Sequence, residues 1–588
     1  PPKGVLTAQK APPVRVTRNL TPIDWKQVKP DVRVYDLGQN MVGRARIEVY
    51  GPRGSRVVMR YSERVNADGS IHRDEIDCYH HQGPFQQEEY TLRGSTFMAP
   101  EKYESRFTYH GFRYVEVTIL PPDDPATRCQ DGVSPELATV GAGNLPCVES
   151  LTGRVLHTDF GETGRFISSN DLINRTQANT LWSYRGNFVG IPTDCPHREK
   201  NGWTGDAQLA CAMAMYNFDN APAYVQWLRS VREEQSESGN FTGIAPSQNW
   251  GWWAGPAWDS AIIVIPWYLY TYTGDIQPLR EHYDSMVRFN DYLYDKMESD
   301  PNHVVDMSLG DWVPAKTVTP QGVTSTGYLY FDTVALSQIA KILGKSDDAS
   351  RFSQRADIVR ENFRKAYLKS DGTVSIGSQT AESTAIFMGF VTDPQERSLV
   401  AQKLVAAVEG GDYRIDTGIF GAKYLFRTLS ETGNHDLAYR IMMGREPPGY
   451  GAWLESDATT LWEAWSLKDA WAASLNHVMF GDISGWFHEY LAGIQLSQNP
   501  DQPLTHDPSG VAFRKIRLTP RPVGDLTSAS STIRTPYGEL SSAWRVENGT
   551  FIHDIRIPVN TTAVVVLPYG GGEKEVGSGT YRFETPVK

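Results

Sequence analysis

Hydrophobic and polar residues alternate along residues 30–120, which is the pattern of strands that bury one face. The strand candidates are short and rich in β-branched residues, with Gly, Asn and Pro turns between them. They are VRVYDLGQN, RARIEVY, SRVVMRYSE and RYVEVTIL. We therefore expect an antiparallel β-sandwich that ends in a Pro/Gly/Asp-rich loop at 121–150.

From about residue 169 to 476, apolar residues recur every three to four positions, which is the period of an amphipathic helix. In LYFDTVALSQIAKILGK they form one helical stripe, and Gly344 marks its end. Twelve such segments lie near 169–186, 206–217, 220–238, 259–273, 277–297, 329–343, 347–368, 380–390, 395–408, 418–431, 435–444 and 459–475. Twelve helices favour six hairpins closed into an (α/α)6 barrel. An open helical array is the alternative, but it would want a clearer sequence repeat.

Strand-like alternation returns after about residue 510, for example in NTTAVVVLP, with PYG and ENG turns. This pattern predicts a second antiparallel β-sandwich. We therefore expect a multidomain chain whose central all-α (α/α)6 barrel is flanked by N-terminal and C-terminal sandwiches. The expected boundaries are an extension or linker at 1–29, a sandwich at 30–150, a catalytic barrel at 151–508 and the second sandwich at 509–588.

Charge and cysteine content exclude several classes of function. The 588-residue chain has a net charge of -12, whereas a nucleic-acid-binding protein needs a basic face. No apolar run approaches the roughly 18 residues of a membrane-spanning helix, so we expect no membrane insertion. Neither Cys nor His residues have metal-binding spacing, and we expect neither a metal nor a cofactor. A disulfide between Cys129 and Cys147 could close the segment between them.

The chain begins PPKGVLTAQK, with neither a methionine nor a signal peptide. This start predicts a processed or truncated product and leans toward a secreted or periplasmic location. Glycosylation sequons occur at Asn19, Asn174, Asn240, Asn548 and Asn560. Five is close to the number expected by chance, so the sequons do not decide the compartment.

Four of the predicted connections between helices are longer than the fold requires and rich in charged and aromatic residues. They lie at 187–205, 239–258, 298–328 and 447–463. Each has a carboxylate beside tryptophan, which for 239–258 is Asp259, directly after the loop. In a closed barrel, such loops gather at one mouth. Because tryptophan faces suit flat apolar surfaces such as the C–H faces of sugars, we expect a binding site there.

The first of these loops continues into IPTDCPHREKNGWTGDAQ, residues 191–208. Prolines on both sides of Asp194 prevent a helix there, and a helix should begin around Thr204 or Gly205, with Asp206 in its first turn. Taken singly, the charged residues have structural explanations. Asp194 suits an Asx-turn, Asp206 suits a helix N-terminus, and Arg198 with Glu199 could be an exposed pair.

Hydrolysis of a glycosidic bond needs two carboxyl groups. One protonates the leaving oxygen, while the other activates water or attacks directly. Glu199 suits the acid, because an adjacent tryptophan and two aspartates would raise its pKa. The partner should come from a distant loop across the mouth of the barrel. Glu463 in TTLWEAW qualifies, as do Glu455 and Asp457.

The segment TDCPHREKNGWTGDAQ, preceded by NFVGIP, resembles the signature of the bacterial and fungal α-L-rhamnosidases of glycoside hydrolase family 78. YDLGQNMVG (35–43) and FTYHGFRYVEV (107–117) are similar to the family's sandwich before the barrel. The family's barrel loops are similar, in the same order, to PAWDSA, GDWVPA, DATTLWEAW and SLNHVMFG. TPYG and NTTAVVVLP are similar to its C-terminal sandwich, so the resemblance covers almost the whole chain.

The resemblance implies an exo-acting, inverting hydrolase that removes terminal α-L-rhamnose from a glycoside, oligosaccharide or polysaccharide. The family's general acid, seven residues before the aspartate of GDAQ, falls on Glu199. Its general base, in the TTxWE motif, falls on Glu463. The implied sugar-binding residues are Asp194, Arg198, Trp203, Asp206, Trp258, Asp311, Trp312 and His477.

The chain departs from the family pattern at Asp457, where members often have glycine. This carboxylate could tune the pKa of Glu463, contact a substrate or be an exposed loop charge. The rival functions are another (α/α)6 glycosidase, a uronate lyase and a non-catalytic polysaccharide-binding protein. A lyase would need a Tyr or His base with basic residues for the uronate, so the paired carboxylates favour a hydrolase.

Overall fold

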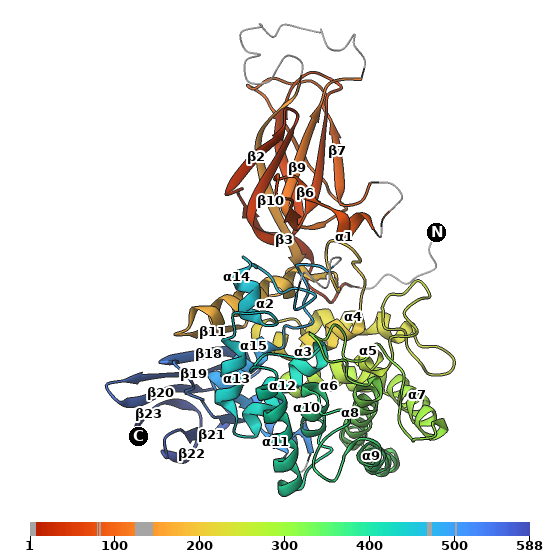
Figure 1. The fold of residues 1–588 in the computed structure, drawn as a ribbon, viewed down its shortest axis with the longest axis vertical. Helices are drawn as coiled ribbons and strands as arrows, with labels where there is room; N and C mark the ends of the chain where they lie inside the picture. The colour runs from red at the N-terminus through yellow and green to blue at the C-terminus, as the bar shows by residue number, and fades with distance from the viewer. Residues whose placement is uncertain are drawn as a thin grey trace.

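The computed structural model describes residues 8–78, 80, 84–123, 145–466, 473–499 and 502–587. An N-terminal β domain, a central helical domain and a C-terminal β domain follow one another along the chain (Figure 1). This is the predicted order. Most of the 121–150 loop lies outside the described residues, and so does Cys129, the partner of Cys147 in the predicted disulfide.

The N-terminal domain is built around the long strand β3 (Val32–Tyr50), whose residues are buried at alternate positions over much of its length. β3 pairs with β2, β8, β9 and β10. The other elements are β1 (Val14–Leu20), β2 (Asp24–Lys29), β4 (Arg56–Ser62), β5 (Arg64–Val65), β6 (Ile71–His72), α1 (Asp74–Asp77), β7 (Gln87–Thr91), β8 (Glu101–Glu104), β9 (His110–Leu120) and β10 (Cys147–Thr158).

Residues 14–29 are part of this sheet and not the predicted extension or linker. β1 pairs with β10 from Val14↔Thr158 to Leu20↔Gly153, and β2 pairs with β3. The prediction failed because β1 and β2 are edge strands with mostly exposed side chains, so their sequences carry little hydrophobic alternation.

The central domain has two sets of helices. The outer set is α2 (Asp171–Gly186), α4 (Ala221–Glu233), α7 (Gln277–Ser299), α9 (Ser346–Tyr367), α11 (Pro394–Gly410) and α13 (His435–Met442). The inner set is α3 (Thr204–Asn217), α6 (Ala261–Thr273), α8 (Gln321–Ile342), α10 (Gln379–Phe387), α12 (Ile419–Glu431) and α15 (Ile483–Trp486), which continues as a π-helical turn, Phe487–Leu491. The short helices α5 (Pro256–Asp259) and α14 (Tyr450–Glu455) lie in connections.

The inner helices form a closed ring. Each contacts the next in the order α3, α6, α8, α10, α12, α15 and back to α3. Inner helices such as α3 and α8 are buried on nearly all sides, whereas outer helices such as α9 bury one apolar stripe. This arrangement is the predicted (α/α)6 barrel. In the described part of the chain, no helix is long and apolar enough to span a bilayer.

The sixth inner helix lies at 483–491 and not at the predicted 459–475. Residues 459–466 are instead irregular, and two backbone hydrogen bonds of 2.9 Å join 461–463 to 474–477. The apolar side chains of this segment are buried on more than one side, so their spacing imitates a helical stripe. The real helix is short and contains glycine, which weakened its signal.

The C-terminal domain is a sandwich of two sheets (Figure 1). One contains β11 (Gly164–Ser168), β18 (Ser528–Thr535), β19 (Gly538–Glu547), β20 (Thr550–Ile557) and β23 (Gly579–Pro586). The other contains β14 (Ile494–Leu496), β17 (Lys515–Leu518), β21 (Thr562–Leu567) and β22 (Gly572–Val576). Two small ribbons are β12 (Phe188–Val189) with β13 (Ile191–Pro192), and β15 (Gln498–Asn499) with β16 (Gln502–His506). β17 and β21 run parallel, in contrast to the expected antiparallel pairing.

The N-terminal domain contacts the loops that precede α3. The His80 ring bonds the Arg198 carbonyl oxygen (3.0 Å), and Lys200 Nζ donates to the Tyr109 carbonyl oxygen (2.7 Å). A Cβ at Gly111 would lie 2.9 Å from the His197 nitrogen, so a larger residue would push the two domains apart. The sandwich therefore covers part of the barrel mouth.

Candidate active site

Asp194 closes the loop that carries Arg198 and Glu199. Its backbone N–H donates to the Asn201 carbonyl oxygen (3.0 Å), and its Oδ1 accepts the Asn201 N–H (2.9 Å). Asp194 is buried, and burial together with the charges of Glu199 and Asp206 raises its pKa well above the usual value. α3 begins at Thr204, as expected.

Glu199 points its carboxylate at three donors. Oε2 accepts the indole N–H of Trp203 (2.9 Å) and a weaker bond from Asn201 Nδ2 (3.4 Å). Oε1 accepts from Arg198 Nη2 (3.0 Å). The side chain stays 30% exposed, so a bound substrate could reach it.

Glu463 comes to the same place from the 459–466 segment. Its Oε2 accepts the Ser474 N–H (2.6 Å), and Arg198 Nη2 donates to Oε1 (3.0 Å) and Oε2 (3.1 Å). Burial works to raise the pKa of Glu463, but Arg198 and the Ser474 N–H outweigh it and hold the pKa below the usual value. The carboxyl is therefore ionised near neutral pH, as a general base requires.

One guanidinium nitrogen thus joins both predicted catalytic glutamates. Arg198 Nη2 lies 3.0 Å from an oxygen of Glu199 and 3.0 Å from an oxygen of Glu463, so these two oxygens are separated by at most twice that distance. Arg198 was predicted to bind substrate, and in the structure its guanidinium contacts both carboxylates. Arg198 and Glu463 are 265 residues apart in sequence.

A second group of titratable side chains lies beside the first. His477 Nε2 is 3.3 Å from Asp206 Oδ1, and His477 Nδ1 bonds the Asp194 carbonyl oxygen. Burial raises the pKa of Asp206 to about 8 and lowers the pKa of His477 to about 4. Asp206 and His477 are therefore both neutral at pH 6, so their contact is not an ion pair.

The predicted aromatic residues take different positions. Trp258 is buried in α5, and a Cβ at Gly205 would meet its ring at 2.5 Å, so glycine is required beside Asp206. Trp312 is 40% exposed and its carbonyl oxygen accepts the N–H of Ile419 at the start of α12 (3.1 Å).

The carboxylate of Asp311 is hydrogen-bonded to the start of α12. Its carboxylate accepts three backbone N–H bonds, from Gly418, Phe420 and Gly421, at 2.7 to 3.1 Å, and one from the Thr380 hydroxyl (2.5 Å). A buried carboxylate with four donors is structurally occupied. The geometry therefore favours a supporting role for Asp311 over the predicted sugar contact.

Asp457 pairs with the N-terminal domain. Its Oδ2 lies 2.6 Å from Arg113 Nη1, and its side chain is 74% exposed. Its φ of +60° is one that glycine adopts freely and aspartate tolerates, which accounts for either residue at this position. Of the alternatives considered, the exposed loop charge describes it best.

Two residues that the sequence reasoning did not single out lie beside Trp203. The rings of Trp250 and Trp253 lie 5.8 and 6.1 Å from the ring of Trp203 and 5.2 Å from each other. Both are exposed, at 41% and 50%. The run WGWWAG in a long loop was the available signal. Within the described residues, no group of His, Cys, Asp or Glu converges in a way that could hold a metal ion.

Comparison with known proteins agrees with this architecture along the whole chain. The model of the bacterial alpha-L-rhamnosidase 6 hairpin glycosidase domain matches residues 161–491, which is more than half of the chain. The chain belongs to this family. The family's concanavalin-like domain matches residues 26–134, and its C-terminal domain matches residues 499–582.

Individual relatives are similar over most of this chain. The alpha-L-rhamnosidase of Streptomyces avermitilis is 32% identical over 98% of this chain and 54% of its own length. Its crystal structure complexed with L-rhamnose matches with a TM-score of 0.86 over 99% of this chain and 54% of that one. The alpha-L-rhamnosidase structure from Dictyoglumus thermophilum is 32% identical and matches with a TM-score of 0.84, over 98% of this chain and 64% of that one. The chain therefore spans about half the length of the curated relative.

Proposed function

We propose that the protein is an exo-acting α-L-rhamnosidase that hydrolyses terminal α-L-rhamnose with inversion at the anomeric carbon. The observation that carries the proposal is the Glu199–Arg198–Glu463 arrangement, in which two carboxylates from distant loops meet at the barrel mouth. Membership of the family and the relative crystallised with L-rhamnose support the sugar assignment.

In the proposed mechanism, Glu199 donates a proton to the glycosidic oxygen as the bond to the sugar breaks. Glu463 takes a proton from a water that attacks the opposite face of the ring. The low pKa of Glu463 supports the base role, because a base must be ionised at the working pH. The partial exposure of Glu199 supports the acid role, since the leaving group must reach it.

Asp194 and Asp206 are proposed to hold the sugar hydroxyls. Among the described residues, Asp194 Oδ2 is buried without a hydrogen-bond partner, and a hydroxyl would satisfy it. Trp258 and Trp312 would line the apolar side of the sugar, including its C6 methyl group. Burying that methyl contributes about 1–3 kcal/mol of discrimination against sugars that lack it.

The first test replaces each proposed catalytic glutamate by glutamine. Glu199→Gln and Glu463→Gln should each lower kcat on a rhamnoside with a poor leaving group by about 10²- to 10⁴-fold. The losses should differ on an aryl rhamnoside with a very acidic phenol. Such a leaving group needs no proton, so Glu199→Gln should recover activity on it, whereas Glu463→Gln should not.

The matched control is Glu455→Gln. Glu455 was an alternative candidate from the same loop, and it pairs with Arg445 at an exposed position. This variant should keep wild-type kcat. Retained activity in both Glu199→Gln and Glu463→Gln would contradict the assignment.

Stereochemistry is tested separately by NMR of the fresh product. Inversion predicts that β-L-rhamnose appears before mutarotation, because water attacks from the face opposite the leaving group. Initial formation of α-L-rhamnose would instead require a covalent intermediate and would rule out this mechanism.

A further inference from the structure

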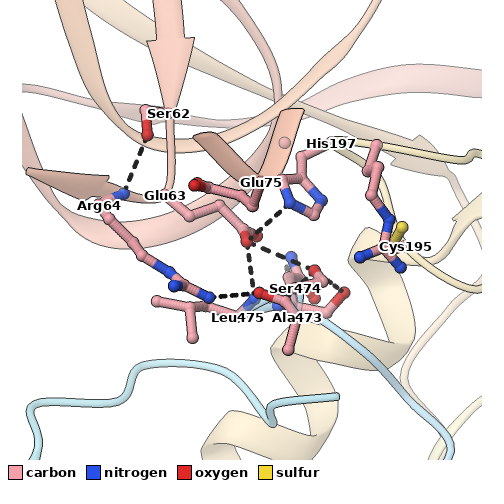
Figure 2. Close-up of polar contacts among 12 residues, drawn as sticks. Ser62, Glu63, Arg64, Glu75, Cys195, His197, Ala473, Ser474 and Leu475 are labelled. Atoms are coloured by element: carbon pink, nitrogen blue, oxygen red, sulfur yellow. Dashed lines mark hydrogen bonds and ion pairs between the residues drawn. The ribbon is translucent and has the colours of Figure 1, made fainter. Parts of the chain in front are cut away.

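The carboxylate of Glu63 lies at the junction of the N-terminal sandwich and the barrel (Figure 2). Glu63 directly follows β4 and is almost completely buried. Two of its partners come from the other domain. Leu475 N–H donates to Oε2 (2.7 Å), and the Ser474 hydroxyl approaches the same oxygen (3.4 Å). A sandwich residue therefore holds a segment of the barrel.

The segment held by Glu63 also holds Glu463. The backbone N–H of Ser474 donates to Glu463 Oε2 (2.6 Å), and the next N–H, that of Leu475, donates to Glu63 Oε2 (2.7 Å). Residues 474–475 are thus clamped between two carboxyl groups, one from each domain.

Other bonds from the sandwich fix the same region. Asn40 Nδ2 donates to Glu63 Oε1 (2.9 Å) and to the Leu475 carbonyl oxygen (3.2 Å). Arg64 donates to the Ala473 carbonyl oxygen. Figure 2 shows Glu63 and Arg64 reaching this segment from the sandwich side. Because Glu63 accepts the central N–H, its loss would free the segment next to Ser474.

His197 is the second link to the site. Its Nε2 lies 3.6 Å from Glu63 Oε2, and it directly precedes Arg198, which binds Glu463. Burial lowers the pKa of His197 well below the usual value, so the ring facing Glu63 is neutral. The charged groups near Glu63 are Arg64 and Glu75.

We propose that Glu63 is a positioning residue for catalysis. By accepting the Leu475 N–H, it keeps the Ser474 N–H on Glu463 and so aims the base at the attacking water. This inference rests on the proposed function of Glu463. It also gives the N-terminal sandwich a part in the reaction, because the sandwich supplies the residue that orients the base.

The environment of Glu63 determines which variant mimics it. Burial raises the pKa of Glu63 to about 7, although the bonds from Asn40 and Leu475 partly oppose this. At pH 6 the side chain is mostly a neutral carboxylic acid. Glutamine has the same shape, is neutral and keeps an acceptor oxygen, so Glu63→Gln is the conservative variant and Glu63→Ala the disruptive one.

The test compares kcat and KM of these variants on an aryl rhamnoside at pH 6. Glu63→Ala should lower kcat by about 10-fold or more with KM changed less than about twofold, because a misplaced base weakens only the chemical step. Glu63→Gln should keep kcat within about twofold of wild type. Wild-type kcat in Glu63→Ala, or a change in KM alone, would overturn the proposal.

Glu101→Ala is the matched control. Glu101 is also a buried glutamate of the sandwich and accepts backbone N–H bonds, from Arg93 and Gly94 (3.1 Å each), but these donors belong to its own domain. Its loss should lower the melting temperature without lowering kcat. If Glu101→Ala and Glu63→Ala reduced kcat equally, Glu63 would have only a structural role.

Hydrogen–deuterium exchange gives a readout that does not require activity. Peptides covering residues 473–478 should exchange faster in Glu63→Ala than in wild type, Glu63→Gln or Glu101→Ala. If the wild-type protein hydrolysed no rhamnoside, the proposed function would fail, and exchange alone would decide whether Glu63 holds this segment. Unchanged exchange in Glu63→Ala would refute the positioning role in either case.

Discussion

Arg198 contacts the two proposed catalytic carboxyls unequally. Its Nη2 donates to both, but Glu463 receives two bonds from it and a third from Ser474, whereas Glu199 stays more exposed. A fixed positive charge favours the ionised form of the group it contacts. Arg198 therefore helps to keep the proposed base, Glu463, deprotonated.

Replacement of Arg198 by methionine should move the acidic limb of the pH profile of kcat/KM to higher pH. Without the guanidinium, the pKa of Glu463 rises, so the base becomes protonated at a pH where the wild-type base is still ionised. Arg198→Lys keeps a positive charge but loses the planar geometry, and its limb should shift less. An acidic limb that stays in place in Arg198→Met would contradict this role.

At the residue scale, the sequence predicted which side chains meet but not how they are paired. Glu199, Glu463, Asp194, Asp206 and His477 lie together, as the motifs implied. The shared contact of Arg198 spans 265 residues and depends on loop geometry that no local pattern encodes. The four donors that occupy Asp311 come from α12 and Thr380 and were equally invisible in its own motif.

At the element scale, the 239–258 loop extends the site on the side of Glu199. Trp203 donates to Glu199, and the exposed rings of Trp250 and Trp253 lie beside it. A leaving group has to contact the acid, so these rings offer it a flat apolar surface. This loop therefore bears on the choice of substrate.

Trp253→Ala should raise KM for a rhamnoside with a large flat leaving group by about 5-fold or more, which corresponds to about 1 kcal/mol of lost contact. KM for methyl rhamnoside should change little, because a methyl group does not reach the ring. Trp25→Ala is the control, since Trp25 is also exposed but belongs to the N-terminal sheet. Equal effects on both substrates would argue against a leaving-group contact.

Hydrophobic periodicity predicted eleven of the twelve barrel helices and failed at the last inner one. The outer helices bury one stripe, and the long inner helices contain enough apolar residues to be found by length. α15 has four residues before its π-helical turn, which is too short for a periodic signal. The segment before it, 459–466, is mostly buried but not helical, so its buried apolar residues imitated the spacing of a helix.

At the scale of the whole molecule, several buried carboxyl groups couple stability to pH. Burial raises the pKa of Glu382 to about 7, that of Glu63 to about 7 and that of Asp206 to about 8. These groups hold a proton more tightly in the folded chain than in the unfolded chain. Their contribution is therefore present at acidic pH and is lost as pH rises through the folded-state pKa values.

Glu382→Gln should make the melting temperature less dependent on pH between pH 5 and pH 8. Glutamine is neutral throughout, so at pH 8 the variant avoids a cost of roughly 1–3 kcal/mol that ionised Glu382 imposes. Glu409→Gln, an exposed position on α11, is the control and should leave the pH dependence unchanged. An unchanged slope in Glu382→Gln would contradict the raised pKa.

The order of domains was predictable because the hydrophobic period changes from that of strands to that of helices and back again along the chain. The junctions were not. β1 and β2 join the first sheet with mostly exposed side chains. β11 precedes the first barrel helix in sequence, but it pairs with β18 of the C-terminal domain. Such pairings are set by which sheet edge is available in three dimensions, and the sequence near a junction does not carry that information.

The contacts between the sandwich and the base region have a consequence for synthesis. Asn40 bonds Thr459 and Glu63 bonds Leu475, pairs that are 419 and 412 residues apart. A chain growing on the ribosome completes its first β domain and five inner helices before these partners exist, since domains fold as units in order of emergence. The segment that carries Glu463 therefore docks on a β domain that has already folded, and the two proposed catalytic carboxyls come together only after Leu475 has emerged.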